Sequence, residues 1–587
     1  MSEEKKLSEV EYIKSKSNLL RGTLLESLDN EVTGSIAADD TQLIKFHGSY
    51  QQHDRDLESE RKRQKLEPLY SFMIRIRVPG GVVTPQQWLC LDELAEEYGS
   101  GTLKLTTRQA IQLHGILKKD LQKTIQGFNA VLMDSFAGCG DVNRNVMCNP
   151  NPSQSHIHAQ AYEDAALISA HLTPKTAAYH EIWLAPLLSP PEGDGSVPTF
   201  TEKGEEVTSA HLGGDGGAEE PIYGKTYLPR KFKIAIAIPP YNDTDIYSND
   251  VGLIAIEKNG ELIGYNIVAG GGLGMTFGMP ETYPRLASRL GFVRRENIIK
   301  AVESIVTIQR DWGNRENRKL SRMKYTIDRV GLETFTEELE QRMGFKLEPV
   351  APYLFTRSGD VFGWSQNMDG THNVLLFIEG GRVKDTENYL LKTALRKVAE
   401  IHDGDFLVTG NQNLQIRGIS EKNKLVIQLL LDHYKVLPEL NKTGLRLNSI
   451  ACVALPTCSL AFAEAERYLP DLITKIDEIL YENGLDKEEI IIRMTGCPNG
   501  CGRPYLGEIG LVGRAVGRYN LYLGASFKGE RLNKLYKEML DEEGILNELR
   551  PIITRYAQER FEEERFGDFT IRKGYVKATT HGMNFHA

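Results

Sequence analysis

The sequence predicts an α+β (mixed α/β) fold in which two related halves are arranged with pseudo-two-fold symmetry. Three observations support this prediction. A strand–helix–strand pattern in the first quarter of the chain returns about 300 residues later, in a chain of 587 residues. Each copy of the pattern is followed by a longer stretch that is typical of a larger α/β module. The chain is also too long for one hydrophobic core, so several domains are expected.

The first copy is identified from hydrophobic periodicity. Its expected elements are, in order, a strand in SFMIRIRVPGG (71–81), a helix in QQWLCLDELAEEYG (86–99) and a pair of strands in TLKLTTRQAIQLHG (102–115). In the first strand the apolar residues alternate with Met73, Arg75 and Arg77, which is the two-residue period of a strand. The Pro-Gly-Gly sequence that follows is expected to end it.

The second copy repeats this order. Its expected elements are NVLLFIEGGRV (373–383), ENYLLKTALRKVAEIH (387–402) and FLVTGNQNLQIRG (406–418). Four identities align the two copies: Thr106 with Thr409, Gln109 with Gln412, Gln112 with Gln415, and Gly115 with Gly418. Gly80-Gly81 likewise matches Gly380-Gly381. An ordered set of this kind indicates a duplicated unit.

The alignment extends into the larger modules with less support. NRNVMC (143–148) falls over LNSIAC (447–452), which places Cys148 against Cys452. YLPRKFKIAIAIPP (227–240) can correspond to EIIIRMTGCPNGC (489–501). In that case one half kept cysteines where the other kept basic residues.

The repeat divides the chain into an N-terminal extension and two pairs of units. The expected ranges are 1–65 for the extension, 66–145 and 346–425 for the half-domains, and 146–345 and 426–587 for the larger modules. The extension is polar and charge-dense, and we expect its helical pieces to wrap around the core. Residues 184–222 are rich in Gly, Pro and acidic residues, which predicts a long surface loop or insertion.

Composition and charge exclude several functions. The net charge is −10 and the pI is about 5.8, so nucleic-acid binding has no electrostatic support. No stretch approaches the roughly 18 apolar residues of a membrane span, and the N-terminus has no apolar signal core. Seven cysteines is an odd and sparse number for a secreted disulfide framework. The predicted location is the cytoplasm.

Four cysteines form the first candidate site. They lie in ACVALPTCS (451–459) and TGCPNGCGRP (495–504), as Cys452, Cys458, Cys497 and Cys501. The first pair is six residues apart, which does not fit the knuckles of structural zinc sites, and the Cys-x-x-Cys redox pair is absent. An iron–sulfur cluster tolerates irregular spacing because its separate irons meet loops from different directions. The cluster is favoured, while zinc and unligated cysteines stay open; buried thiols are expected at the other three positions, Cys90, Cys139 and Cys148.

The second candidate site is cationic and lies mostly in the first half. Its members are Arg75, Arg77, Lys104, Arg108, His114, Arg144, Arg230, Lys231 and Lys233. Residues two apart on a strand share a face, so Arg75 and Arg77 can point to one side, and Lys231 and Lys233 can do the same. Apolar neighbours suggest partly buried strands, where a cation is costly unless an anion meets it. An anionic cofactor or substrate is favoured for the set, and solvated strand faces paired with acidic residues are the alternative.

A glycine run, GGGLG at residues 270–274, invites interpretation as a nucleotide-binding loop. It has neither the GxGxxG nor the Walker A pattern, so a tight turn near a ligand is the safer interpretation. No fingerprint for NADPH or a flavin is found elsewhere in the chain.

These motifs together resemble the sirohaem- and [4Fe-4S]-containing sulfite/nitrite reductase family. The resemblance covers nearly the whole chain and includes FHGSYQQHDRD, LTTRQAIQLHGILKK, GDVNRNVMC, YLPRKFK, QRDWGNR, TGCPNGCGRP and FGDF. It implies ferredoxin-like half-domains, one sirohaem and one [4Fe-4S] cluster. It also implies the six-electron reduction of sulfite to sulfide, in sulfate assimilation and cysteine biosynthesis.

The resemblance also implies roles for individual residues. The cluster ligands would be Cys452, Cys458, Cys497 and Cys501, and Cys501 would also give its thiolate to the sirohaem iron. The residues around sulfite would be Arg75, Arg144, Lys231 and Lys233. The residues that help to hold sirohaem, which is rich in carboxylates, would be Arg108, Gln112, His114 and Arg230. Lys104 stands where an arginine is expected, which puts its contact in doubt.

Partners follow from the same resemblance. Electrons would come from NADPH through a separate diflavin subunit, so NADPH, FAD and FMN are expected only on that partner. A ferredoxin-dependent sulfite or nitrite reductase of the same family is the alternative. From a different class, a zinc-stabilised module that binds anions without redox chemistry is also considered.

Overall fold

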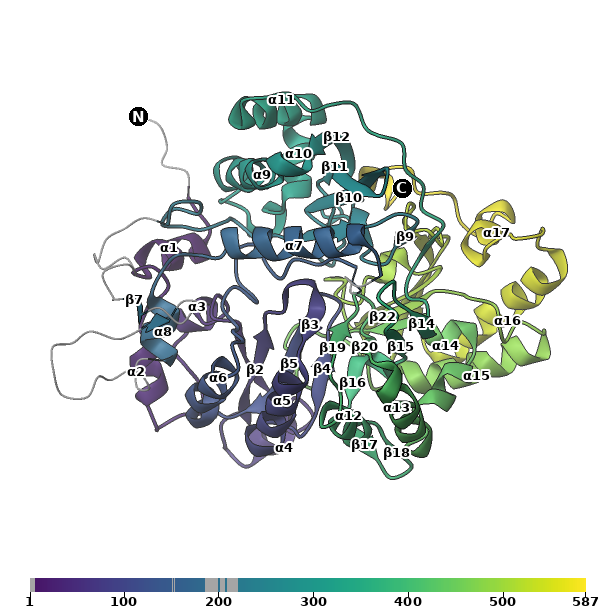
Figure 1. Ribbon diagram of the computed structural model, residues 1–587, viewed down its shortest axis with the longest axis horizontal. Helices are drawn as coiled ribbons and strands as arrows, with labels where there is room; N and C mark the ends of the chain where they lie inside the picture. Colours follow the sequence, from purple (N-terminus) through teal and green to yellow (C-terminus); the bar gives the residue numbers. More distant parts are fainter. Residues whose placement is uncertain (1–5, 150, 152–153, 185–198, 201–205, 208–219) are drawn as a thin grey trace.

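The computed structural model describes residues 6–149, 151, 154–184, 199–200, 206–207 and 220–587. Its two halves lie side by side, with the half-domains and the larger modules visible as separate coloured groups (Figure 1). The insertion expected at 184–222 lies largely outside the described residues. Among the residues that are described, every helix is too short or too polar to span a lipid bilayer.

The first half-domain is a five-stranded antiparallel sheet in the order β1-β2-β5-β4-β16. Its strands are β1 (Ser49–His53), β2 (Tyr70–Ile76), β4 (Leu103–Leu105), β5 (Ile111–Ile116) and β16 (Arg382–Val383). Helices α5 (Pro85–Tyr98) and α6 (Leu121–Asn129) pack together on it. Thr84 and Gln87 form a capping box, and Pro85 occupies the first turn, so the sequence fixes where α5 begins.

The second half-domain has the same layout in the order β14-β15-β20-β19-β3. Its strands are β3 (Val82–Val83), β14 (Gly363–Gln366), β15 (His372–Leu376), β19 (Asp405–Val408) and β20 (Leu414–Ile419). Its helices are α12 (Leu391–Ala399) and α13 (Glu421–His433). A short hairpin of β17 (Asp385–Thr386) and β18 (Tyr389–Leu390) takes the start of the stretch expected to be helical, so α12 begins at Leu391. Otherwise the predicted order of elements is confirmed in both copies.

The two half-domains exchange a strand. β3 follows Gly80-Gly81 of the first copy but pairs with β19 of the second. β16 follows Gly380-Gly381 of the second copy but pairs with β4 of the first. All four glycines have positive φ angles, between 56° and 79°, which the tight turn into each exchanged strand requires. Across this joint Trp88 stacks on Phe406, with ring centroids 5.0 Å apart.

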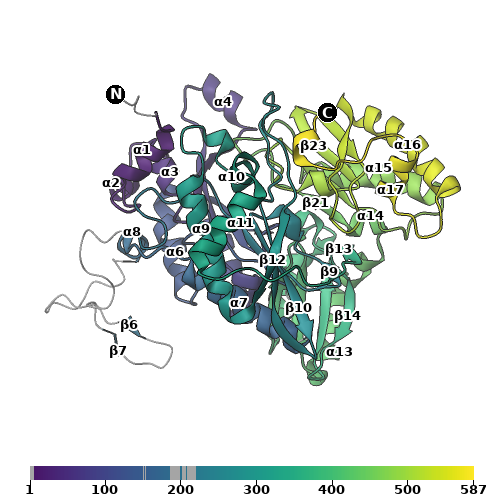
Figure 2. The same cartoon turned by 90° about the horizontal axis from the view of Figure 1, so that it is seen from above.

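The first larger module is a four-stranded sheet in the order β12-β11-β10-β8. Its strands are β8 (Ile234–Ala237), β10 (Val251–Lys258), β11 (Glu261–Ala269) and β12 (Ser288–Arg294). The helices that accompany it are α7 (His156–His171), α9 (Ile298–Trp312), α10 (Met323–Val330) and α11 (Leu332–Met343). Figure 2 shows α7, α9, α10 and α11 grouped beside this sheet.

The second larger module is a five-stranded sheet in the order β21-β22-β23-β24-β25. Its strands are β21 (Ser449–Ala451), β22 (Ile492–Thr495), β23 (Ile509–Ala515), β24 (Arg518–Leu523) and β25 (Lys534–Leu540). Its helices are α14 (Gly444–Leu447), α15 (Leu469–Glu482), α16 (Glu542–Glu559) and α17 (Phe566–Arg572). This module has a hydrophobic core of its own, whereas one continuous core joins the two half-domains to the first larger module.

The remaining elements are short. They are α1 (Glu9–Lys16), α2 (Leu24–Asp29), α3 (Asp40–Leu43), α4 (Glu58–Arg63), α8 (Ala178–Trp183), β6 (Thr199–Phe200), β7 (Glu206–Val207), β9 (Tyr241–Asn242) and β13 (Arg357–Ser358). The N-terminal segment packs onto the first half, because Leu20, Leu24 and Phe46 are buried in the main core. Lys14 Nζ donates to the Leu228 carbonyl oxygen at 2.7 Å, which ties α1 to the first larger module.

A duplicated glutamine clamp confirms the repeat and corrects one detail of its alignment. The side chain of Gln109 bonds the backbone N–H and C=O of Cys148 at 3.0 and 2.9 Å. The side chain of Gln412 bonds the same two groups of Ala451 at 3.2 and 2.9 Å. Cys148 therefore corresponds to Ala451, and the alignment of Cys148 with Cys452 is wrong by one residue. The hairpin identities, such as Gln109 with Gln412, are 303 residues apart, whereas the cysteine alignment used an offset of 304. At the offset of 303, Asn145 falls on the identical Asn448.

Candidate active site

The four cysteines meet at one edge of the sheet in the second larger module. β21 and β22 are parallel neighbours, so their carboxyl ends lie at the same edge. Cys452 directly follows β21, and Cys497 comes two residues after β22. Each strand thus delivers one cysteine pair in the loop that follows it. Cys452 N donates to the Met494 carbonyl oxygen at 3.2 Å and holds the start of the first loop against the second strand.

Polar hydrogens of the loops point at the sulfur atoms. Thr495 Oγ1 and Gly496 N both lie 3.3 Å from Cys452 Sγ. Asn499 Nδ2 lies 3.4 Å from Cys497 Sγ. Donors of this kind stabilise the thiolate form, which is the form that binds metals.

Burial works in the opposite direction. It raises the pKa of Cys452 and of Cys497 to about 12, and the nearby Cys501 adds to both shifts. Burial also raises the pKa of Cys458, again with a contribution from Cys501. Buried thiols of this kind become thiolates when a metal takes the place of the proton. The set therefore has the chemistry of a metal site, with Cys501 exposed at its rim.

The arrangement does not suit a single metal ion. Within the described part of the chain, no three His, Cys, Asp or Glu side chains are placed to bind one ion together. A mononuclear zinc centre gathers its sulfur ligands at about 2.3 Å from the metal. The four thiols act on one another electrostatically. An iron–sulfur cluster accepts ligands from several loops because it has several irons, so it fits this set.

Two lysines of the first half lack a partner of their own. Lys231 and Lys233 stand on the segment that leads into β8, and no hydrogen bond or ion pair joins either ammonium group to another described residue. Burial, with Arg230 and Arg144, lowers the pKa of Lys231 to about 7. Burial and Lys231 lower the pKa of Lys233 well below its usual range. Both side chains remain partly accessible, so an anion from outside can neutralise them.

Two arginines extend this cationic cluster. Arg75 Nη1 lies 2.7 Å from Cys139 Sγ, and Arg144 donates twice to the Gly140 carbonyl oxygen at 3.2 Å. Tyr50 connects them, because its ring lies 5.9 Å from the Arg75 guanidinium and its hydroxyl pairs with Arg144. The predicted substrate residues Arg75, Arg144, Lys231 and Lys233 thus belong to one region of positive charge.

Three residues of this region had no recognisable signal in the sequence. Lys45 lies 5.6 Å from the centre of the Tyr50 ring, and burial with Arg318 lowers its pKa to about 8. Tyr50 and Cys139 were not singled out as site residues because neither belongs to a charge or spacing pattern. The pairing of β1 with β2 brings Tyr50 opposite Met73, and only that pairing places it beside Arg75.

Two of the predicted cofactor residues carry donors with no partner. Gln112 is oriented so that its oxygen accepts from Arg75 Nε at 2.9 Å and its nitrogen donates to His114 Nε2 at 3.1 Å. The proton of neutral His114 then sits on Nδ1, which is buried without a partner. Arg108 binds Asn249 Oδ1 and the Asn145 carbonyl oxygen, both at 2.5 Å, but its Nε is also buried without a partner.

These unsatisfied donors are what a ligand rich in carboxylates would satisfy. Burial lowers the pKa of Arg108 to about 9 and, together with Arg318, that of Arg230 to about 10. Burial, with Arg382, also lowers the pKa of His114 well below its usual range. Each shift shows that burial disfavours the charged form of the group, which an anion nearby would favour. The residues present therefore fit sirohaem.

The cationic cluster of one half faces the cysteine loops of the other. A thiolate at Cys501 raises the pKa of Lys231, against the larger lowering effect of burial. Thr107 Oγ1, on the turn between β4 and β5, donates to the Cys501 carbonyl oxygen at 3.1 Å. Met275 N, just after the glycine run, donates to the Pro498 carbonyl oxygen at 3.0 Å. The run at 270–274 is an irregular segment after β11, with an isolated bridge between Gly272 and Arg285, so the expected tight turn is wrong. The segment leads into this contact with a cysteine loop, and the site lies where the two halves meet.

Two cations predicted from strand periodicity lie elsewhere. Arg77 is neutralised by Asp134 at 2.6 Å and also binds Thr173, so it does not share a site with Arg75. Lys104 is paired with Glu466 at 2.6 Å and is nearly inaccessible. Cys139 and Cys148 are buried as expected, but Cys90, on α5, is only half-buried.

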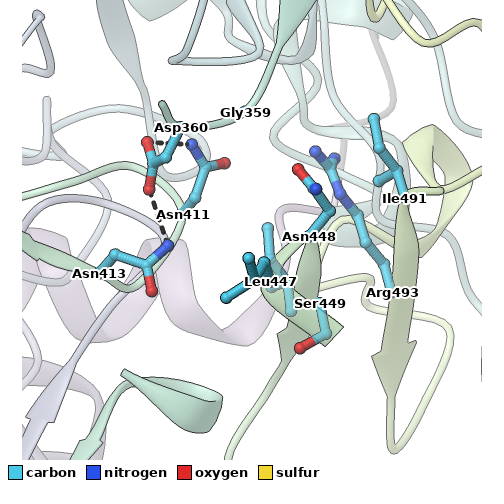
Figure 3. A pocket seen from close by; sticks show the side chains of 10 residues that line it. Gly359, Asp360, Asn411, Asn413, Leu447, Asn448, Ser449, Ile491 and Arg493 are labelled. Atoms are coloured by element: carbon cyan, nitrogen blue, oxygen red, sulfur yellow. Dashed lines mark hydrogen bonds between the residues drawn. The ribbon is translucent and has the colours of Figure 1, made fainter. Parts of the chain in front are cut away.

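A polar pocket on the other side of β21 is a separate feature (Figure 3). Asp360 there accepts hydrogen bonds from Asn411 at 2.9 Å and from Asn413 at 2.8 Å. Arg493 lines the same pocket and donates to Asp245 Oδ2 at 2.6 Å. The pocket contains none of the predicted site residues, and both of its charged side chains already have partners: Asp360 binds Asn411 and Asn413, and Arg493 binds Asp245. We therefore assign it to the packing of the two halves.

A duplicated α/β chain that sets four thiols beside a cluster of buried cations has the layout of a redox enzyme with a metal cluster and an anionic ligand. The chain belongs to the nitrite and sulfite reductase family. The nitrite/sulfite reductase ferredoxin-like half domain matches residues 64–131 and 365–433, and the nitrite and sulphite reductase 4Fe-4S domain matches residues 163–347. The chain is therefore an oxidoreductase, and its cofactors are a sirohaem and a [4Fe-4S] cluster.

Full-length relatives agree with this assignment. A protein of Staphylococcus epidermidis named "Sulfite reductase [NADPH] hemoprotein beta-component" is 54% identical over 100% of this chain and 98% of its own length. A protein of Anoxybacillus flavithermus with the same name is 55% identical over 99% of this chain and 98% of its own. The solved structure of the Mycobacterium tuberculosis NirA protein has a TM-score of 0.72 and 21% identity, covering 95% of this chain and 96% of that one. It supports the fold.

The 4Fe-4S domain match does not itself place the cluster. Its range, 163–347, belongs to the first larger module, whereas the four clustered cysteines lie between 452 and 501, outside both matched ranges. The matched range itself, 163–347, contains no cysteine. The thiols of the second module are therefore the ones with suitable chemistry.

Proposed function

We propose that this chain is the haemoprotein subunit of an assimilatory, NADPH-dependent sulfite reductase and reduces sulfite to hydrogen sulfide with six electrons. The observation that carries the proposal is the pair of unpartnered lysines, Lys231 and Lys233, of which Lys231 interacts with Cys501. A small oxyanion would neutralise them at the place where the metal site begins. The names of the relatives, at 54–55% identity over nearly the whole chain, support sulfite as that anion.

The residues present would hold both cofactors. Cys452, Cys458 and Cys497 would bind the cluster, and Cys501 would serve both the cluster and the sirohaem iron. The unsatisfied donors of Arg108 and His114 would meet carboxylates of the sirohaem, with Gln112 and Arg230 beside them. When bound, the two cofactors supply the electrons and an iron that binds the substrate.

The chain's own side chains would bind sulfite and move protons. Arg75 and Arg144 stay charged at any ordinary pH, so they position and stabilise the anion without giving up a proton. Lys231 and Lys233 have lowered pKa values, which makes them the acids of the site. Each oxygen of sulfite leaves as water and takes protons with it, so an acid in contact with the departing oxygen speeds every stage.

The activity is expected to fall as the pH rises. Lysine is charged only below its pKa, so raising the pH through about 7 removes the positive charge and the proton of Lys231. Carboxylates of bound sirohaem favour the charged lysine, so the midpoint of the fall in kcat/KM is expected at about 7 or higher. The measurement is the pH profile of sulfite reduction with reduced methyl viologen as donor. Lys231→Arg should shift or weaken this fall, leaving the part that Lys233 contributes, and a profile unchanged by that substitution would contradict the assignment.

An external flavoprotein would supply the electrons. The name "beta-component" on the relatives implies a second component, and we propose a diflavin subunit that carries NADPH, FAD and FMN. The only glycine run considered for a nucleotide packs against the cysteine loop instead. The purified chain is expected to oxidise NADPH in the presence of sulfite only when the flavoprotein is added. Rapid turnover with reduced ferredoxin and none with the flavoprotein would favour the ferredoxin-dependent alternative.

Absorption and metal analysis test the function as a whole. The purified chain should be coloured, with haem-type bands, and should contain about four cluster irons plus one haem iron. It should also convert sulfite to sulfide with reduced methyl viologen. A colourless protein that contains zinc would overturn the proposal in favour of an anion-binding module.

We also propose a cytoplasmic location. All seven cysteines are free thiols. Cys139 and Cys148 are fully buried, which fits a reducing compartment. Detection of the protein in the soluble cytoplasmic fraction of its host would test this.

A further inference from the structure

A buried ion triad lies where the exchanged strand β16 pairs with β4. Arg382 and Lys104 are direct partners in the register of these strands, so two cations stand side by side. Glu466 lies between them: its Oε2 is 2.6 Å from Lys104 Nζ, and its Oε1 is 2.6 Å from Arg382 Nε. The three residues come from the first half-domain, the second half-domain and the second larger module.

Glu466 cannot be removed from this triad without consequence. The Lys104 side chain is 2% exposed, and those of Glu466 and Arg382 are 13% and 15% exposed. Without the carboxylate, two neighbouring cations would remain together in a region with little water to screen them. Lys104 also donates to the Gly380 carbonyl oxygen, so the turn into the exchanged strand is part of the same assembly.

The same residue holds the cysteine loop. Glu466 N donates to the carbonyl oxygen of Cys452 at 3.1 Å. The side chain of Glu466 is thus anchored to both half-domains, while its backbone is anchored to the residue that follows β21. The Glu466 side chain also packs closely against the turn at Gly380, because a Cβ added at Gly380 would lie 3.2 Å from Glu466 Cγ.

We propose that Glu466 is a positioning residue for the cluster site, which transmits the fixed geometry of the exchanged strands to the backbone of Cys452. This inference rests on the proposed function in one respect only, namely that Cys452 binds the cluster. Lys104 and Arg382 act through Glu466, because neither has a bond to the cysteine loop among the described contacts. The triad therefore determines how firmly the loop between Cys452 and Cys458 is held.

The test is Glu466→Gln in the full-length protein, with Glu464→Gln as matched control. Glu464 is two residues away but pairs with Arg467 on the surface, so its loss leaves the triad intact. Glu466→Gln is expected to speed the removal of iron by a ferrous chelator at least about tenfold and to raise hydrogen exchange in residues 452–462. The control should match the wild type in both. Exchange is measured on apoprotein as well, so that one readout does not depend on the cofactor.

A second variant covers the case in which Glu466→Gln does not fold. Lys104→Met with Glu466→Gln removes one of the two cations along with the anion, so it relieves the repulsion but still frees the cysteine loop. It should fold and should still release iron faster than the wild type. Iron retention and exchange equal to the wild type in either folded variant would overturn the inference. Wild-type protein that binds no iron would instead overturn the proposed function, and unchanged exchange in the apoprotein variants would still decide against Glu466.

Discussion

Cys501→Ser is expected to lower sulfite reduction by about 10³-fold or more, the scale on which loss of an essential catalytic group acts. A thiolate at Cys501 raises the pKa of each of the other three cysteines and also that of Lys231. It is therefore the one residue that belongs to both the metal site and the anion site. Serine keeps the size of the side chain but is a poor ligand for iron at neutral pH.

The measurement combines turnover with spectroscopy. Cys501→Ser should lose the haem-type absorption, the cluster signal in electron paramagnetic resonance, or both, together with methyl viologen-dependent activity. Cys90→Ser is the matched control, because it makes the same chemical change on α5, at a half-buried thiol outside the site. Full cofactor content and full turnover in Cys501→Ser would show that this thiol is not the bridge.

Lys231→Ala is expected to lower kcat by about 10²-fold, which is the lower end of what a general acid contributes. The cofactors should stay bound, because Lys231 makes no hydrogen bond or ion pair with the described residues that form the cofactor site. The substitution removes both a proton donor and a cation, so the KM for sulfite should rise as well.

Lys231→Arg separates these two effects. Arginine restores the cation but does not release its proton, so KM should recover while kcat stays low. Lys225→Ala is the matched control, since Lys225 is exposed on the same segment. An unchanged absorption spectrum with unchanged kcat in Lys231→Ala would remove Lys231 from the mechanism.

Much of the architecture could be predicted because duplication leaves identical residues at positions with special geometry. Gln109 and Gln412 both have positive φ angles, 53° and 71°, and both clamp a backbone segment. Gly115 and Gly418 have φ angles of 80° and 70° at the same point of their strands. Such backbone conformations restrict the choice of residue, so the same residues occur in both copies and the repeat can be recognised in the sequence.

The cysteine site could be predicted because the two members of each cysteine pair lie on one loop and are therefore close in sequence. The cationic site was harder. Arg77 has the same strand periodicity as Arg75, but Asp134 neutralises it through a long-range contact that no local pattern reports. The role of Lys104 likewise depends on Glu466, 362 residues away.

The strand exchange could not be predicted at all. β3 and β16 have two residues each, too few to show any period. Their partners are chosen by the direction in which the chain leaves a glycine turn, which is a property of the folded backbone. The site residues that depend on tertiary pairing, such as Tyr50, were missed for the same reason.

The exchanged strands also bear on how such a protein can diverge. Because β3 completes the sheet of the second half-domain and β16 completes that of the first, either copy made alone would expose an unpaired sheet edge. Selection therefore acts on the two copies as one inherited unit. Each half can then carry functional groups that its counterpart lacks. The cluster of four thiols lies in the second half, and the ammonium and guanidinium groups of the cationic cluster lie in the first. Because each half-domain needs a strand from the other, the two halves stay together in one chain and can differ in their site residues.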